Sequence, residues 1–143
     1  MKKILVPVDG SECSVRGVKH VLDVRAEYRD PAGLKIHLLN VQPGLPNDVS
    51  RFISADQIKS YHHDQGVKEL ESARALLDAA GAQYEVHISV GDPAATISQF
   101  ATQLGVDQIV MGTHGRGGVT GMLLGSVAGK TLVQAPVPVL VVK

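Results

Sequence analysis

Short apolar runs alternate with segments of helical periodicity along the whole chain. The runs predict strands, because strands of a parallel sheet that is covered on both faces are largely apolar. Between the runs, apolar residues recur every three or four positions and predict helices. The strands are expected at residues 3–8, 34–41, 82–90, 106–111 and 137–142.

Strict alternation of strand and helix is typical of βαβ units. It predicts an α/β fold in which a five-stranded parallel sheet carries four helices distributed over both faces. We expect one domain spanning 1–143 with the strand order 3-2-1-4-5. In this order the connections after the first and fourth strands leave in opposite directions, and such folds bind ligands in the crevice beyond those strand ends. Asp9 and Gly112 follow or end these two strands.

Capping signals predict several helix boundaries. Ser11 is expected to cap the first helix, and Asp92 followed by Pro93 predicts the start of the third. Gly81 and Gly105 are expected to end the second and third helices, because glycine tolerates the left-handed conformation found there.

The long second helix, expected over 55–80 after a loop at 43–48, has an apolar and a charged face. The residues expected to face inward are Val67, Leu70, Leu77 and Ala80. The solvated side is expected to carry His62, His63, Asp64, Glu69, Glu71 and Arg74. Adjacent helical residues point about 100° apart, so the run at 62–64 is not expected to bind a metal ion.

Composition and charge narrow the class of function. Lys plus Arg and Asp plus Glu both total 14, and aromatic residues make up only 3%. Nucleic-acid binding is not expected, since it normally needs a basic surface or stacking aromatics.

Cys13 is the single cysteine, which is typical of an intracellular chain, and it is expected to be a small buried apolar residue. The apolar run at 4–8 is too short for a signal peptide or a membrane span, so we expect a cytoplasmic protein.

Residues 111–127 carry the main candidate chemistry. Five glycines fall between Gly112 and Gly121, and Gly125-Ser126 opens the next predicted helix. Glycine lets the backbone approach an anion closely, and the N–H groups at a helix start attract one. A Gly-rich surface turn is the competing interpretation. The position of the stretch at the predicted crevice favours a phosphate site.

Two well-known phosphate motifs do not fit. The segment from Gly125 to Thr131 resembles a P-loop, but it has three residues between its glycines instead of four and lies within a predicted helix. Lys130 is therefore expected on a helix surface. The segment from Gly115 to Thr120 lacks the third glycine of the dinucleotide fingerprint.

A more specific pattern is Gly112-x-x-Gly115, nine residues, then Gly125-Ser126. It resembles the G-2x-G-9x-G-(S/T) motif of the ATP-binding branch of the universal stress protein family. The resemblance extends over the whole chain and includes ILVPVDGS at 4–11, HLLNV at 37–41, DP at 92–93 and PVPVLVVK at 136–143. Residues 43–56 depart from it as ordinary loop variation. The resemblance implies a Rossmann-like fold, similar to that of the adenine nucleotide alpha hydrolases, and a stress-response regulator that binds ATP, ADP or AMP.

The resemblance also implies roles for individual residues. Pro7 and Val8 line the adenine and ribose side of the site, and the Val41 backbone meets the adenine edge. Asp9 contacts the ribose or a phosphate-bound Mg²⁺, although Asp-Gly also fits a simple turn. The residues that wrap the ribose and phosphates are Met111, Gly112, His114, Gly115 and Arg116. Those that hold the phosphate tail are Gly125, Ser126 and Val127. His114 fits a solvent-exposed loop residue equally well.

No catalytic group is assigned. Asp9 is the one acidic side chain expected near the phosphates, so any ATP hydrolysis should be slow. An interaction module without nucleotide turnover and an adenylating or kinase-type enzyme on the same fold remain alternatives. The enzyme would show an SGGxDS-like loop, whereas residues 9–14 read DGSECS. A flavin carrier would need stacking aromatics, which the predicted crevice loops lack.

The last predicted strand indicates a partner. Its apolar residues are Val137, Val139, Leu140, Val141 and Val142. An apolar edge strand promotes association, and pairing with a second copy would cover it. The family resemblance likewise implies a homodimer. The weak alternation of the third strand predicts that it forms the opposite edge.

Overall fold

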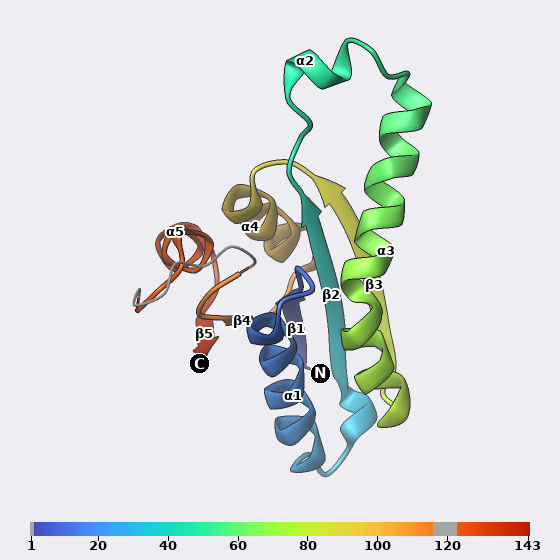
Figure 1. Ribbon diagram of the computed structural model, residues 1–143. Helices are drawn as coiled ribbons and strands as arrows, with labels where there is room; N and C mark the ends of the chain where they lie inside the picture. Colours follow the sequence, from blue (N-terminus) through green and yellow to red (C-terminus); the bar gives the residue numbers. More distant parts are fainter. Residues whose placement is uncertain (1, 116–122) are drawn as a thin grey trace.

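The computed structural model describes residues 2–115 and 123–143. Its strands form one parallel sheet in the order β3-β2-β1-β4-β5, as predicted, and the α/β fold class is confirmed (Figure 1). The strands are β1 (Lys2–Pro7), β2 (Leu34–Gln42), β3 (Tyr84–Val90), β4 (Gln108–Gly112) and β5 (Val139–Val142). The helices are α1 (Glu12–Ala26), α2 (Asn47–Ser50), α3 (Ala55–Ala79), α4 (Pro93–Leu104) and α5 (Ser126–Gln134), with a short 3₁₀ turn η1 (Pro31–Gly33).

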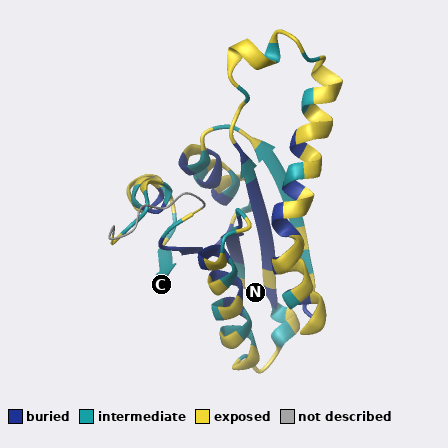
Figure 2. Ribbon diagram, viewed as in Figure 1, coloured by how far each residue is buried: buried dark blue, intermediate teal, exposed yellow. Residues whose placement is uncertain are grey.

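The sheet separates two apolar cores. Even-numbered residues of β1, such as Ile4 and Val6, pack with the buried side chains of α1 and α3. The odd-numbered Leu5 packs instead with residues of α4 and α5. Successive side chains of a strand point to opposite faces, so a run that is apolar at every position supplies both cores. The inner strands β1, β2 and β4 are accordingly largely buried and the edge strands β3 and β5 partly so, whereas the helices expose their outer sides (Figure 2).

The capping residues act as the sequence predicts. The Ser11 hydroxyl accepts a hydrogen bond from the Ser14 backbone N–H at 3.2 Å. The Asp92 carboxylate accepts one from the Ala95 N–H at 3.1 Å. Gly105 follows α4 with a left-handed φ of 63°. Over the described ranges, no helix combines the length and apolar character needed to cross a bilayer.

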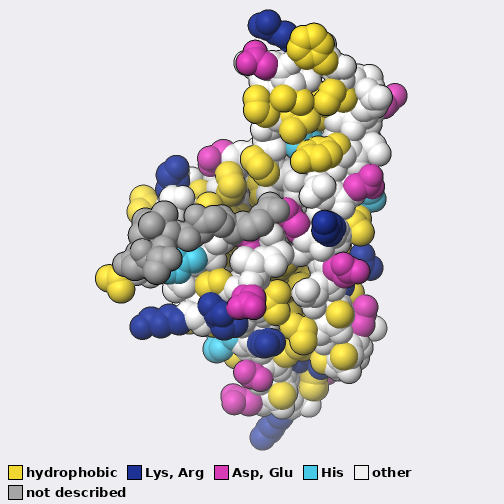
Figure 3. Space-filling view, in the orientation of Figure 1, with side chains coloured by type: hydrophobic (Ala, Val, Ile, Leu, Met, Phe, Trp, Pro, Cys, Tyr) yellow, Lys and Arg dark blue, Asp and Glu magenta, His cyan; other side chains and the backbone are white. Residues whose placement is uncertain are grey.

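The connection between β2 and α3 differs from the prediction. Residues 43–48 were expected to be loop throughout, but the one-turn helix α2 begins at Asn47. This end of the molecule projects beyond the sheet, and hydrophobic side chains gather on its surface (Figures 1 and 3). Val49, Phe52 and Tyr61 are exposed there. The third strand is also shorter than predicted and begins at Tyr84.

The inward face of α3 is only partly the predicted one. Leu70 and Leu77 are buried as expected, whereas Val67 is 42% exposed and Ala80 is exposed too. His62 and Glu69 were placed on the solvated side, and this was wrong, since both are buried. Residues 62, 66, 69, 70, 73 and 77 form the buried side of the helix. The helix is therefore rotated relative to the face that its apolar residues alone indicate.

Glu69 is buried because two amides of β2 bind its carboxylate. The Asn40 side-chain N–H₂ group donates to Glu69 Oε2 at 2.7 Å, and that of Gln42 donates to the same oxygen at 2.9 Å. Asn40 also donates to the Val8 carbonyl at 2.9 Å. A buried carboxylate is stable only when its oxygens are satisfied in this way. The network fastens α3 to β2 and to the residue that follows β1.

We predict that Glu69→Ala lowers the free energy of unfolding by about 1–3 kcal/mol, because it leaves two buried amide groups without this acceptor. Glu71→Ala is the matched control: Glu71 is exposed on the same helix, and its loss should change stability by less than about 0.5 kcal/mol. Urea denaturation followed by far-UV circular dichroism measures both values. Equal stability of the two variants would contradict a structural role for the network.

Candidate functional site

A cavity lies at the carboxyl ends of β1, β2 and β4, between the first turns of α4 and α5. Most of its lining is apolar, and Asp9, Ser14 and His114 supply polar side chains. The complete lining consists of Pro7, Val8, Asp9, Ser14, Leu39, Val41, Pro93, Ile97, Met111, Gly112, His114, Gly115, Val127 and Ala128. An apolar cavity with a few polar groups at the strand ends of such a sheet is the usual form of a small-molecule site.

The cavity opens where the central strand stops. β1 ends at Pro7, which has no backbone N–H to donate, while β2 continues to Gln42 and β4 to Gly112. The Val8 N–H still donates to the Leu39 carbonyl at 2.8 Å. Alternate residues of a strand turn their main-chain groups to the same neighbour. The main chain of Val41 therefore faces the space that β1 has left.

One backbone hydrogen bond joins the two ends of the Gly-rich stretch, and a second joins its start to β5. The Gly125 N–H donates to the Thr113 carbonyl at 2.6 Å, and the Thr113 N–H donates to the Val142 carbonyl at 3.0 Å. Gly125 is the N-cap of α5, and within the described residues no side chain caps that helix. The N–H groups of its first turn thus lie next to His114 and Gly115 at the mouth of the cavity.

The glycines of the motif permit close contacts within the protein. A Cβ atom on Gly112 would lie 2.6 Å from the Cys13 carbonyl oxygen, and one on Gly125 would lie 3.0 Å from that of Thr113. A Cβ atom on Gly115 would lie 2.5 Å from Asp9 Oδ2. Larger residues at these positions would separate the elements that form the cavity. The spacing of the motif therefore has a structural reason besides any ligand.

Cys13 connects α1 to the start of the same stretch. Its Sγ lies 3.3 Å from Thr113 Oγ1 and accepts from the His114 N–H at 3.4 Å. Burial raises the pKa of the Cys13 thiol, but hydrogen bonds from Thr113 and His114 outweigh burial and hold the pKa below its usual value. The residue is buried as predicted, yet it is also a polar contact of the site and more than an apolar filler.

Asp9 is held in a fixed orientation at the edge of the cavity. Its Oδ1 accepts hydrogen bonds from the Ser11 N–H at 3.0 Å and from the Ser11 hydroxyl at 2.5 Å. Its own N–H donates to Ser14 Oγ at 3.4 Å. The left-handed Gly10, with φ of 85°, allows the turn that leads from Asp9 into α1. Asp9 is thus both the turn residue and the acidic group of the cavity.

Most of the predicted site residues meet at this cavity. Those that line it are Pro7, Val8, Asp9, Val41, Met111, Gly112, His114, Gly115 and Val127. Gly125 and Ser126 are not part of the lining but form the start of α5 beside it. Arg116 lies outside the described residues. The sequence reasoning missed Ser14, Leu39, Pro93, Ile97 and Ala128. Of these five residues, only Pro93 had been singled out in the sequence, as part of the predicted helix start at Asp92-Pro93.

Comparison with known proteins identifies the family. The profile described as "Universal stress protein family" matches residues 1–143. Universal stress protein MJ0531 of Methanocaldococcus jannaschii is 35% identical over 99% of this chain and 82% of its own length.

Two solved structures have the same fold. The structure of hypothetical protein MJ0577 superposes with a TM-score of 0.82 at 33% identity, covering 99% of this chain and 95% of the other. A universal stress protein from Archaeoglobus fulgidus, solved in complex with dAMP, has a TM-score of 0.69 at 23% identity over 100% of this chain and 98% of its own. The family model matches the whole chain, and the relative from Methanocaldococcus jannaschii is 35% identical to it. This chain is therefore a member of the universal stress protein family.

Proposed function

We propose that the cavity binds an adenine nucleotide, with ATP as the first candidate. The chain would then belong to the ATP-binding branch of its family and act as a stress-response regulator. One observation carries the proposal. The apolar space beyond β1 leads directly to the start of α5, which no side chain of the described residues caps, and to the glycines of the predicted motif. A nucleotide has the same two parts, a flat apolar base and a charged tail.

The base would occupy the apolar part of the cavity. Leu39, Ile97 and Ala128 line this part and are buried. The Val41 main chain, which faces the space left by β1, offers an N–H and a carbonyl at the edge of the base. Donor and acceptor groups on one main-chain segment suit the edge of adenine, and apolar walls favour transfer of its faces from water.

The phosphates would lie against the first turn of α5. Backbone N–H groups at a helix start, together with the positive end of the helix dipole, stabilise an anion. Gly115 leaves room beside Asp9, and His114 lines the same side of the cavity. A carboxylate next to phosphates repels them unless a cation lies between, so Asp9 suits a Mg²⁺ ion carried by the nucleotide. Among the described residues, no lysine lines the cavity.

The solved relatives support this assignment at the level of the ligand class. The Archaeoglobus fulgidus neighbour, which was solved with dAMP, shares this fold. We expect hydrolysis to be slow or absent, because Oδ1 of Asp9, the acidic side chain at the cavity, already accepts hydrogen bonds from Ser11. It is not arranged as a base for water. Turnover of many ATP molecules per second by the purified protein would contradict this part of the proposal.

We predict that the wild-type chain binds one ATP in titration calorimetry and that Gly125→Val weakens binding by about tenfold or more. A valine Cβ would lie 3.0 Å from the Thr113 carbonyl oxygen and 3.3 Å from His114 Cα. Displacing the helix start from the cavity by overpacking costs about 1–3 kcal/mol, which corresponds to such a factor.

Gly129→Ala is the control for this variant. It changes a glycine of the same helix whose added Cβ would, among the described residues, meet Leu124 at an ordinary 3.7 Å and nothing nearer, so ATP affinity should be kept. Mass spectrometry of small molecules released from the denatured wild-type protein identifies the nucleotide that it carries. Absence of any ATP heat from folded, nucleotide-free wild-type protein would favour the interaction-module alternative.

We also propose that the chain forms a homodimer through β5. β5 is an edge strand with β4 on its inner side. Pro138 and Val142 direct their carbonyl groups to β4, where they accept from Ile109 and Thr113 at 3.0 Å each. By the alternation of a strand, the main-chain groups of Val139 and Val141 point to the outer edge. These groups are suited to pair with β5 of a second copy.

We predict that Val141→Pro converts a dimeric wild-type protein into a monomer in sedimentation experiments. Proline removes the outward N–H of the edge and is tolerated on edge strands, so the pairing with β4 should persist. Val141→Thr is the control, because it keeps the branched side chain and the N–H and should remain dimeric. A monomeric wild-type protein, or a folded proline variant that is still dimeric, would refute pairing through this edge.

A further inference from the structure

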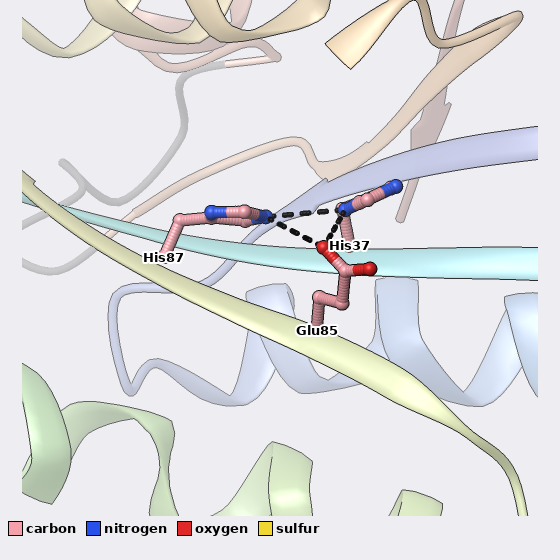
Figure 4. Close-up of side chains that lie close together, drawn as sticks. All are labelled: His37, Glu85 and His87. Carbon is pink, nitrogen blue, oxygen red and sulfur yellow. Dashed lines mark hydrogen bonds and ion pairs between the residues drawn. The ribbon is translucent and has the colours of Figure 1, made fainter.

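Three side chains of β2 and β3 converge away from the cavity. His37 belongs to β2, whereas Glu85 and His87 belong to β3, and one ligand atom of each points to a common centre (Figure 4). His37 Nδ1 lies 3.1 Å from His87 Nε2 and 3.5 Å from Glu85 Oε2. His87 Nε2 lies 4.0 Å from the same carboxylate oxygen.

Strand register brings these residues together. His37 is paired with Glu85 across the parallel ladder, and His87 is paired with Leu39, two residues further along. Residues two apart on a strand share a face, so all three side chains lie on the α4 side of the sheet. Rings at these positions are fixed by their neighbours: His87 lies 5.5 Å from the ring of Phe100 in α4 and 5.3 Å from that of His37.

The separations fit a tetrahedral metal ion. Zinc binds imidazole nitrogen and carboxylate oxygen at about 2.0–2.2 Å, which places neighbouring ligand atoms of a tetrahedron about 3.3–3.6 Å apart. Two of the three observed separations are within a few tenths of an ångström of this value, and the third needs only a small rotation of the exposed Glu85 side chain. Two imidazoles and one carboxylate favour zinc over magnesium or calcium, which prefer oxygen ligands.

Burial and nearby charges both act on His37. Burial holds the pKa of the His37 imidazole below its usual value, although Glu85 opposes this shift. Lys3 and Lys35 are nearby cations that also lower this pKa. Their charge disfavours a metal ion, and the carboxylate of Glu85 offsets part of it. His37 and Glu85 line a surface hollow that gives an ion access from solvent.

We propose that His37, Glu85 and His87 form a zinc site with a fourth position open to water. Without the ion, His37 and His87 share one hydrogen bond, in which one nitrogen donates and the other accepts. With the ion, both facing nitrogens coordinate through their lone pairs, and the ring protons reside on the opposite nitrogens. The binding of Zn²⁺ thus replaces one short contact between two strands by a bridge that links β2 to the edge strand β3.

The experiment uses the full chain without a polyhistidine tag and without nucleotide. Zn²⁺ is titrated near pH 7.5 against a competing chromophoric chelator, and the thermal midpoint is measured with and without Zn²⁺. The wild-type protein should bind one Zn²⁺ per chain with micromolar or tighter affinity and unfold at a higher temperature in its presence, since the ion binds the folded state. Loss of a metal ligand should weaken the affinity by tenfold or more, so His87→Gln and Glu85→Gln should each do so.

Matched controls are available on α3. His63 and Glu71 are exposed there, so His63→Gln and Glu71→Gln should bind Zn²⁺ as the wild type does. The exposed Glu85 gives a second variant if His87→Gln does not fold. Zinc binding weaker than micromolar by the wild type, binding that survives the folded Glu85→Gln variant, or binding that is lost in His63→Gln would overturn the proposal. Because no nucleotide is present, none of these outcomes depends on the proposed function of the cavity.

Discussion

The early end of β1 is the constraint on which the rest of the structure depends. β1 lies at the centre of the sheet and pairs with β2 on one side and β4 on the other, but it stops at Pro7 while both neighbours continue. A proline cannot donate to the next strand, and Asp9-Gly10 then turns the chain into α1. The two neighbouring strands become the walls of a space that no strand fills. The cavity follows from this arrangement before any side chain is considered.

Glycine at the site acts first on the protein itself. Gly112 lets β4 approach the Cys13 carbonyl, and Gly125 lets α5 start against Thr113. When such a motif is interpreted as a phosphate site, its glycines are explained by the space that the ligand needs. The contacts show that the same missing side chains already allow α1, β4 and α5 to meet. Substitutions at these positions therefore affect fold and ligand together, and a control on the same helix is needed to separate the two effects.

The alternation of strands and helices and the caps at Ser11 and Asp92 could be predicted because they rest on local periodicity or local capping, and the topology rules for parallel sheets then led to the strand order. The predicted residues that line the cavity came instead from the resemblance to the universal stress protein family. One error concerns a residue whose partners lie on a neighbouring strand. Glu69 was assigned to a solvated face, yet Asn40 and Gln42 on another element bind it. Nothing in the periodicity of a helix shows which carboxylate meets an amide on a neighbouring strand. Periodicity alone also failed to predict that His62 is buried and that Val67 is exposed.

Strand β2 shows how one alternating face carries two kinds of chemistry. Its residues at 35, 37, 39 and 41 point to the α4 side of the sheet. Along this row the side chains are first a lysine, then a histidine, and then the aliphatic Leu39 and Val41. Leu39 and Val41 line the cavity, whereas His37 lies with Glu85 and His87 two residues nearer the start of the strand. Within the run of apolar residues around it, His37 has no local signal of its role. Its partners come from β3, so only the register of the two strands could reveal that three ligand atoms meet there.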